Sequence, residues 1–187
     1  MGLKVITPPA IISVVSDADL RTHLRIAADG TENGLMAAYR AAAHQAAEHY
    51  TGAAIGSQTL ELALDAFPDE IPLPRGKVTS ITSITYKDTA GAPQTLAESQ
   101  YVLDDYSPVC RIVPADGVSW PSTQALPNAV KVRYVAGDVP PAARAAILLT
   151  VGHLFENREA VAPGTLAEVP MGARHLLDTI RVYGGGA

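Results

Sequence analysis

The chain has 187 residues, of which 48% are hydrophobic and 18% are charged. This length suits one domain, or one domain that carries an insertion, with enough apolar residues for a sizeable core. The formal net charge of −5 at pH 7, with an isoelectric point near 5.4, excludes the basic footprint of a protein that grips phosphates. Charged residues fall below the roughly 25% of an average soluble domain, which is consistent with a surface partly covered by neighbouring subunits.

Residues 16–52 are predicted to form two helices. Ser16 is a natural N-cap, and Asp17 and Asp19 place negative charge in the first turn, at the positive end of the helix dipole. After a polar turn at residues 27–34, a second, alanine-rich helix runs to about Tyr50 and ends at Gly52. Its apolar stripe is predicted at helical spacing on Leu35, Tyr39, Ala42, Ala46 and Tyr50.

From about Ile55 to Ala136 the hydrophobic pattern changes to a period of two. Apolar residues alternate with polar or small ones along residues 59–64 and 130–134, and prolines recur between these runs. Asp88–Gly91 has the composition of a hairpin turn. These features predict a small, mostly antiparallel β unit and argue against helices in this segment.

After Gly137 the sequence becomes helical again. Pro140 and Pro141 open a helix that runs to about Arg158, and apolar residues on most of its sides predict a central position. A loop at residues 160–168 precedes a last helix that starts near Pro170. The apolar stripe of this helix is predicted on Ala173, Leu176, Leu177 and Ile180. The glycines at 184–186 predict a flexible end.

These patterns predict an α+β fold, a small bundle of about four helices with an inserted antiparallel β subdomain. Residues 1–54 and 137–187 would form the helical domain, and residues 55–136 the β subdomain. A helical core can carry such an insertion without disruption, because the two ends of a β insert lie close together.

The single cysteine, Cys110, excludes an internal disulfide and lies in an apolar run, Val109–Val113, that predicts a strand. A buried and unreactive thiol is therefore expected. The N-terminal residues lack the apolar stretch of a signal peptide, and the longest apolar run is far shorter than the roughly 20 residues of a membrane span. We expect a soluble protein from a reducing compartment, without a membrane partner.

No catalytic or cofactor pattern is complete. The segment Gly52–Gly56 lacks the Lys-Ser/Thr of a phosphate loop, and no Gly-x-Ser-x-Gly elbow occurs. The acidic pairs at 69–70 and 104–105 lie near prolines in turn-like segments, where solvated carboxylates are usual. The histidines lack the spacing of metal ligands; they are His23, His44, His49, His153 and His175. We expect no enzyme activity, no cofactor and no metal.

Two places leave alternatives open. Glu156 and Arg158, two positions apart, cannot pair along one face of the central helix. They are either an ordinary helix end or a polar clamp between subunits. Trp120, the only tryptophan, either packs over its own subdomain or anchors a contact with another subunit.

The chain resembles the head–tail connector, or adaptor, proteins of long-tailed phages and prophages, in the longer version that carries a β insertion. The order of several short motifs along nearly the whole chain carries this resemblance, together with the helix–β–helix layout. None of the motifs is catalytic or unique. They are Leu20–Ile26, Tyr50–Gly52, Ile81–Tyr86 with Asp88 and Gly91, Tyr101, Trp120–Pro121, Val130–Gly137, Pro140–Glu159, and Val169–Gly172 leading to Leu176 and Leu177.

The resemblance implies a structural subunit of a ring that docks beneath a portal protein and meets stopper or tail proteins. The ring would match the portal's roughly twelvefold symmetry and enclose a channel through which DNA passes without specific binding. The last helix and tail, about Val169–Tyr183, would face the portal, and the alanine-rich second helix and the central helix would supply core and subunit contacts. The implied docking residues are Val169, Met171, Leu176, Leu177, Ile180, Val182 and Tyr183.

Phages, prophage remnants and gene-transfer particles share this architecture, so the implied location is a virion or phage-like particle assembled in the bacterial cytoplasm. One alternative is a stopper or tail-completion protein, which differs from the adaptor in its partner. The other is a small soluble enzyme, which would need a deep pocket with convergent polar groups around His153 and Glu156.

Overall fold

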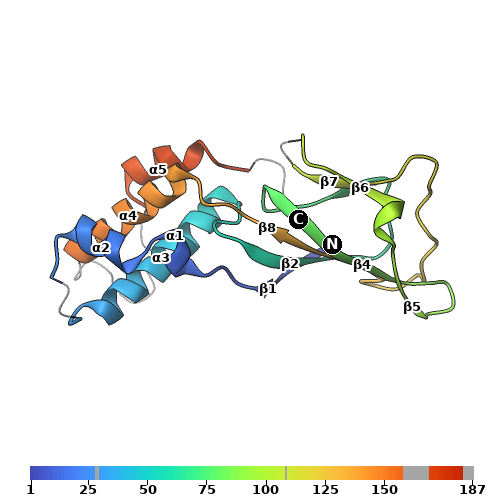
Figure 1. Cartoon of the computed structure of the whole chain (residues 1–187), viewed down its shortest axis with the longest axis horizontal. Coiled ribbons are helices and arrows are strands. Elements are labelled where there is room, and N and C mark those ends of the chain that lie inside the picture. Colours follow the sequence, from blue (N-terminus) through green and yellow to red (C-terminus); the bar gives the residue numbers. More distant parts are fainter. Residues whose placement is uncertain (28–29, 108, 158–168, 183–187) are drawn as a thin grey trace. The chain divides into compact units, whose positions relative to one another are not determined.

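A computed structural model of the chain describes residues 1–27, 30–107, 109–157 and 169–182 (Figure 1). It forms two compact units. The β unit comprises Met1–Pro8, Ser57–Gly137 and Val182, and the helical unit comprises Pro9–Gly56 and Asp138–Arg181. The mixture of helices and antiparallel sheets confirms the predicted α+β class.

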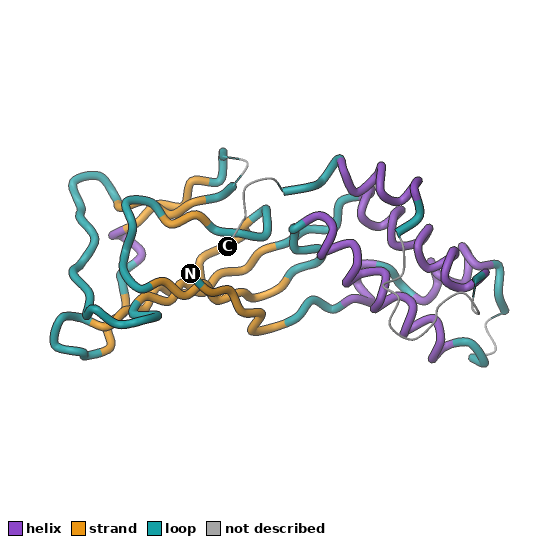
Figure 2. The backbone as a smooth tube through the Cα atoms, turned by 180° about the vertical axis from the view of Figure 1, so that it is seen from behind, coloured by secondary structure: helices purple, strands orange, loops and turns teal. Residues whose placement is uncertain are grey.

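The β unit contains two antiparallel sheets, which lie on opposite sides of the unit (Figures 1 and 2). The five-stranded sheet has the order β1 (Gly2–Thr7), β2 (Gln58–Leu64), β8 (Val130–Ala136), β4 (Val78–Lys87) and β5 (Pro93–Thr95). The three-stranded sheet has the order β3 (Ile71–Pro72), β7 (Arg111–Pro114) and β6 (Tyr101–Asp104), and the short 3-10 helix η1 (Glu98–Gln100) precedes β6.

The predicted two-residue period builds the core of the β unit. Alternate residues of β2 and β8 are buried, and Leu62 pairs with Val132 across the two strands. Ile71 and Ile112 are fully buried on the three-stranded sheet. The free thiol of Cys110, two residues before Ile112, is buried as predicted. Full burial of each such aliphatic side chain contributes about 1.5–3 kcal/mol.

The predicted hairpin turn joins β4 to β5. The Asp88 carboxylate accepts hydrogen bonds from the main-chain N–H groups of Ala90 (3.0 Å) and Ala92 (2.9 Å), and from the Gln94 side chain at 2.9 Å. These bonds, with that from Gln94 the strongest, lower the pKa of Asp88. Gly91 has a φ of 84°, which other residues rarely adopt.

Strand β1 corrects the prediction that residues 1–54 all belong to the helical domain. It pairs with β2 in antiparallel register, with Leu3 opposite Leu62 and Lys4 opposite Glu61. Five of its six residues are exposed, because it is an edge strand. A strand with no buried face needs no alternation of apolar residues, so the sequence pattern did not reveal it.

The helical unit contains α1 (Ile11–Val14), α2 (Asp17–Leu24), α3 (Asn33–Thr51), α4 (Pro141–Glu156) and α5 (Met171–Asp178). The short helix α1 was not predicted. The predicted cap of α2 is confirmed: the Ser16 hydroxyl accepts from the Asp19 N–H at 3.2 Å, and the Asp19 carboxylate accepts from the Ser16 N–H at 2.9 Å. Gly52 ends α3 with a φ of 67°, also as predicted.

Helix α4 is central to this unit, as predicted, since it contacts α2, α3 and α5. It ends at Glu156, and the predicted extension to Arg158 lies outside the described residues. Leu149 on this helix is 41% exposed, so one apolar side of α4 faces away from the core. The buried side chains of α4 are Ala143, Ala146, Ile147, Thr150, Val151 and Leu154.

The buried stripe of α3 lies one residue later than predicted. The structure buries Met36, Arg40, Ala43, Ala47 and Thr51, while the predicted stripe residue Ala42 is exposed. Arg40 is the cause, because a charged residue in the stripe hides its helical period from a hydrophobicity pattern.

The charge of Arg40 can be buried in the helical unit because its guanidinium donates to the Asp17 carboxylate at 2.6 Å and to the Val15 carbonyl at 3.2 Å.

The chain leaves α3 through a fixed turn. Buried His44 places Nε2 2.7 Å from the Ile55 carbonyl oxygen, and the Glu48 carboxylate accepts from the Ile55 N–H at 2.8 Å. Gly56 follows with a φ of 90°, and a Cβ there would lie 3.0 Å from the Val14 side chain. A larger residue would clash at this position, so glycine is required.

Candidate assembly surfaces

The residues proposed for an enzymatic pocket do not form one. His153 and Glu156 are both exposed on the last turns of α4, and the main-chain carbonyl of His153 accepts from the Asn157 side chain at 2.9 Å. Within the described part of the chain, no cluster of His, Cys, Asp or Glu could hold a metal ion. No helix described there has the length and apolar character that crossing a bilayer requires.

The predicted docking element, α5, is fixed to the helical unit by one buried side. Ala173 and Leu177 are at most 1% exposed and belong to the core of the unit. Leu177 therefore packs within its own unit, and its predicted docking role stays a prediction. Met171, by contrast, is 77% exposed. Val169, Leu176, Ile180 and Val182 are partly buried, and Tyr183 lies outside the described residues.

The end of α5 is held against α3 by a polar contact. The Tyr50 hydroxyl donates to the Asp178 carboxylate at 2.7 Å, and the Arg181 guanidinium lies 5.3 Å from the centre of the Tyr50 ring. The hydrogen bond to Asp178 raises the pKa of Tyr50. This contact fixes which side of α5 faces outward and leaves Met171 available for a partner.

The three predicted subunit contacts have different surroundings. Trp120 packs within its own β unit: its ring stacks on Phe67 with centroids 5.0 Å apart, and its Nε1 donates to the Asp69 carbonyl at 3.3 Å. Of its two alternatives, the structure therefore shows packing over its own subdomain. Glu156 is exposed, and Arg158 lies outside the described residues, so a clamp between subunits stays a prediction.

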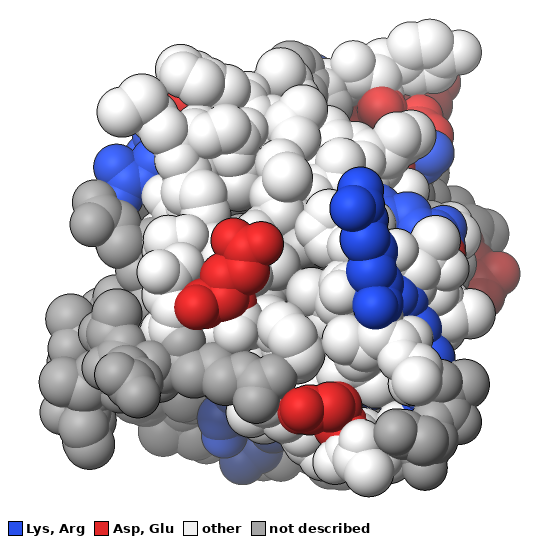
Figure 3. Space-filling model, turned by 90° about the vertical axis from the view of Figure 1, so that its left-hand side faces the viewer, with Lys and Arg blue, Asp and Glu red and all other residues white. Residues whose placement is uncertain are grey.

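Figure 3 views the end formed by the helical unit. Among the residues that are not grey, uncharged side chains cover most of this face, with a few acidic and basic groups between them.

The five-stranded sheet carries its positive charge on its outer side. Residues paired across antiparallel strands share a face of the sheet, and Lys4 pairs with Glu61, which pairs with Arg133. Lys131 pairs with Thr85, two residues before Lys87 on β4. We call Lys4, Glu61, Lys87, Lys131 and Arg133 the basic sheet face.

The three-stranded sheet and its adjoining segments carry the opposite charge. The Asp104 carboxylate accepts from Arg111 Nε at 2.9 Å, and Arg111 also donates to Glu70 at 2.7 Å. Arg111 lowers the pKa of Asp104, and Asp104 raises the pKa of Arg111. We call this sheet and its carboxylates the acidic sheet; they are Asp69, Glu70, Glu98, Asp104, Asp105 and Asp116.

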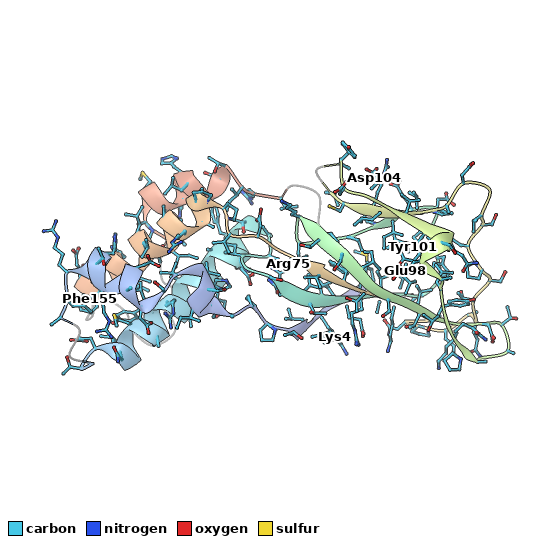
Figure 4. All side chains as sticks on the ribbon, viewed as in Figure 1. Lys4, Arg75, Glu98, Tyr101, Asp104 and Phe155 are labelled. Atoms are coloured by element: carbon cyan, nitrogen blue, oxygen red, sulfur yellow. The ribbon has the colours of Figure 1, made fainter. Side chains whose placement is uncertain are left out.

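Sequence reasoning missed this division of charge because the net charge of −5 is a sum over the whole chain. The signal was present in the alternation of Lys131 and Arg133 with buried β8 residues, which places both cations on one face. Figure 4 shows Lys4 and Asp104 on opposite sides of the β unit.

No family model and no curated protein matches the chain. Among solved structures, the chain is similar to one in the neck of an empty GTA particle computed with C6 symmetry, with 27% identity, a TM-score of 0.78 and full coverage of both chains. It is similar to a chain in the virion of a native gene transfer agent (GTA) particle, with 26% identity, a TM-score of 0.78 and coverage of 100% and 99%. It is also similar to a chain in the neck of a native GTA particle computed with C12 symmetry, with 25% identity, a TM-score of 0.74 and full coverage of both.

Proposed function

We propose that this protein is a structural subunit of a ring in the neck of a phage-like particle, where it acts as the adaptor between portal and tail. The observation that carries this proposal is the likeness to particle-neck chains over 100% of both chains, at a TM-score of 0.78. Such coverage includes the helical unit and the β unit together, so the shared feature is the whole helix–β–helix arrangement and not one common fold within it.

The symmetry of the neighbouring structures supports assembly with copies of itself. Two of the similar chains come from necks computed with C6 and C12 symmetry. A closed ring needs a heterologous contact, in which one patch of a subunit meets a different patch of the next.

The helix α5 is the proposed portal-docking element. Its inner side is fixed by Leu177 and by the Tyr50–Asp178 hydrogen bond, while Met171 is exposed beside it. A short amphipathic helix that presents an apolar residue fits the helix-in-groove mode of recognition. DNA would pass through the ring without specific binding, because a chain of net charge −5 gives little affinity for phosphates.

Site-specific photo-cross-linking tests the assigned position in the particle. A photoreactive amino acid at position 171 should cross-link to the portal protein in particle-producing cells. The control is the same group at position 106, where Tyr106 is 99% exposed on the β unit. Cross-links from position 171 to a tail protein instead would favour a stopper or tail-completion protein. Absence of the protein from purified particles would refute a neck function of either kind.

Point variants are preferable to removing the last helix, because deletion would also remove Ala173 and Leu177 from the core. Met171→Glu should reduce incorporation into particles at least tenfold, since it places a charge in an apolar contact. Met171→Leu keeps the apolar surface and is the matched control. Equal incorporation of both variants would show that α5 does not dock through Met171.

A further inference from the structure

We propose that copies of this protein join head to tail through their β units, with the basic sheet face of one copy docked on the acidic sheet of the next. This inference rests on the proposed function, since it names the surfaces that would close the neck ring. The partner at each surface is thus a second copy of this chain.

The basic sheet face has the charge needed for such a contact. It carries four cationic side chains and one carboxylate, and that carboxylate, Glu61, is paired with Arg133 at 2.6 Å. Lys4, Lys87 and Lys131 are exposed on the open side of the sheet. Their charges are available to a partner that brings carboxylates.

A hollow in this face gives the contact a shape as well as a charge. It has a volume of about 200 Å³ and lies over the edge of the sheet formed by β1 and β2. The row Gly2, Ala63 and Lys131 leaves space there because its first two residues have almost no side chain. Lys4, Lys131 and Glu61 line the hollow, and Glu61 is already paired with Arg133. A carboxylate from a neighbouring copy would meet both ammonium groups.

The acidic sheet offers the complementary groups. Of its six carboxylates, Asp104 and Glu70 are occupied by Arg111. The other four belong to exposed residues in the turns and short segments around β6 and β7; they are Asp69, Glu98, Asp105 and Asp116. Val102 is 51% exposed on β6, which adds an apolar contact to this surface.

The placement of the two surfaces favours a ring over a dimer. They lie on opposite sides of one β unit, as Lys4 and Asp104 show in Figure 4. Two basic faces repel each other, and so do two acidic sheets, so a symmetric dimer through either surface is disfavoured. Basic on acidic is a heterologous contact, which repeats from copy to copy and forms a ring where the rotation between copies closes.

Duplex DNA is the competing partner for the basic sheet face. A second copy accounts for both charged surfaces with one contact, whereas DNA would use the lysines and leave the acidic sheet without a partner. The charges of the β unit therefore favour self-association.

Charge-reversed variants test the inference directly. The basic-face variant carries Lys4→Glu, Lys87→Glu and Lys131→Glu. The acidic-sheet variant carries Asp69→Lys, Glu98→Lys, Asp105→Lys and Asp116→Lys, which leaves the Arg111 pairs intact. Trp120 fluorescence reports whether the β unit of each variant is folded, since this tryptophan stacks within it.

Each variant alone should associate at least tenfold more weakly than the wild type, as measured by native mass spectrometry at low salt. An equimolar mixture of the two should recover rings, because every junction between unlike variants again pairs opposite charges. Wild-type association should also weaken as salt is raised, since salt screens exposed charges. Recovery by mixing cannot come from misfolded chains.

Two results would overturn the inference. Rings formed by either variant alone would show that the charged surfaces do not hold copies together, even if the protein is a neck subunit. A failure of the mixture to assemble would exclude their mutual pairing. If the basic-face variant keeps its rings but loses binding to duplex DNA, the lysines serve nucleic acid instead. The particle cross-links at position 171 test the neck function separately.

Discussion

The ion pair of Arg40 with Asp17 provides a test of how the helical unit is held together. Arg40 lies in the buried stripe of α3, with its side chain 11% exposed, while the Asp17 side chain is 50% exposed. The guanidinium also donates to the carbonyl of Val15, which is fully buried. We expect the substitution Arg40→Ala to destabilise the unit by about 2–3 kcal/mol.

This magnitude follows from the unequal exposure of the two partners. Breaking a fully buried pair costs about 3–5 kcal/mol, but Asp17 regains much of its hydration when Arg40 is removed. The Val15 carbonyl does not regain water, and its lost bond contributes about 1–3 kcal/mol. Arg40→Met keeps the apolar stem of the side chain, so it should cost about 1 kcal/mol less than Arg40→Ala.

The control is the pair of Arg144 with Asp19 in the same unit, at 2.5 Å. Their side chains are 47% and 30% exposed. Arg144→Ala should cost less than about 1 kcal/mol, because exposed ion pairs contribute little. Urea unfolding followed by far-UV circular dichroism measures both variants, while Trp120 fluorescence follows the β unit. If Arg40→Ala costs no more than Arg144→Ala, the buried pair does not stabilise the unit as argued.

Two further predictions concern pH. The hydrogen bonds of Asp19 with Ser16, followed by the Arg144 contact, lower the pKa of Asp19 from 3.8 to about 2, so its stabilisation is present above pH 4 and is lost as the pH falls toward 2. Asp19→Asn should thus cost about 1 kcal/mol in thermal unfolding at pH 7 and almost nothing at pH 2; a difference independent of pH would contradict this. Tyr134→Phe should cost about 1 kcal/mol, because the buried hydroxyl donates to the Pro74 carbonyl at 3.0 Å. Burial raises the pKa of Tyr134, so the wild type should lose stability above about pH 10, where the unfolded tyrosine ionises, and the variant should lose less in alkaline urea titrations. Equal alkaline losses would argue against this account.

The sequence predicted the last helix but not which of its residues are exposed, and it did not predict the charges of the two sheets. The last helix was found from its period, yet the pattern could not separate Leu177, which is buried, from Met171, which is exposed. A helical stripe identifies a boundary between core and solvent, and only the packing of α5 on α3 and α4 decides which residues fall on each side. The positive face of the five-stranded sheet depends on strand pairing, which places Lys4 and Arg133 on either side of Glu61 although they are far apart in the sequence.

The sequence alone determined the elements that depend on residues close to one another in the chain. The capping box at Ser16, the stop at Gly52, the turn at Asp88 and the period-two strands all arise from neighbouring residues, and the structure confirms them. Only the tertiary structure decided the features that depend on distant partners. Edge strand β1 forms because β2 is present to pair with it, and the stripe of α3 shifts by one residue because Asp17 and Val15 satisfy a buried arginine. In both places, hydrogen bonds to a segment far away in the sequence decided the structure, and the local hydrophobic pattern did not.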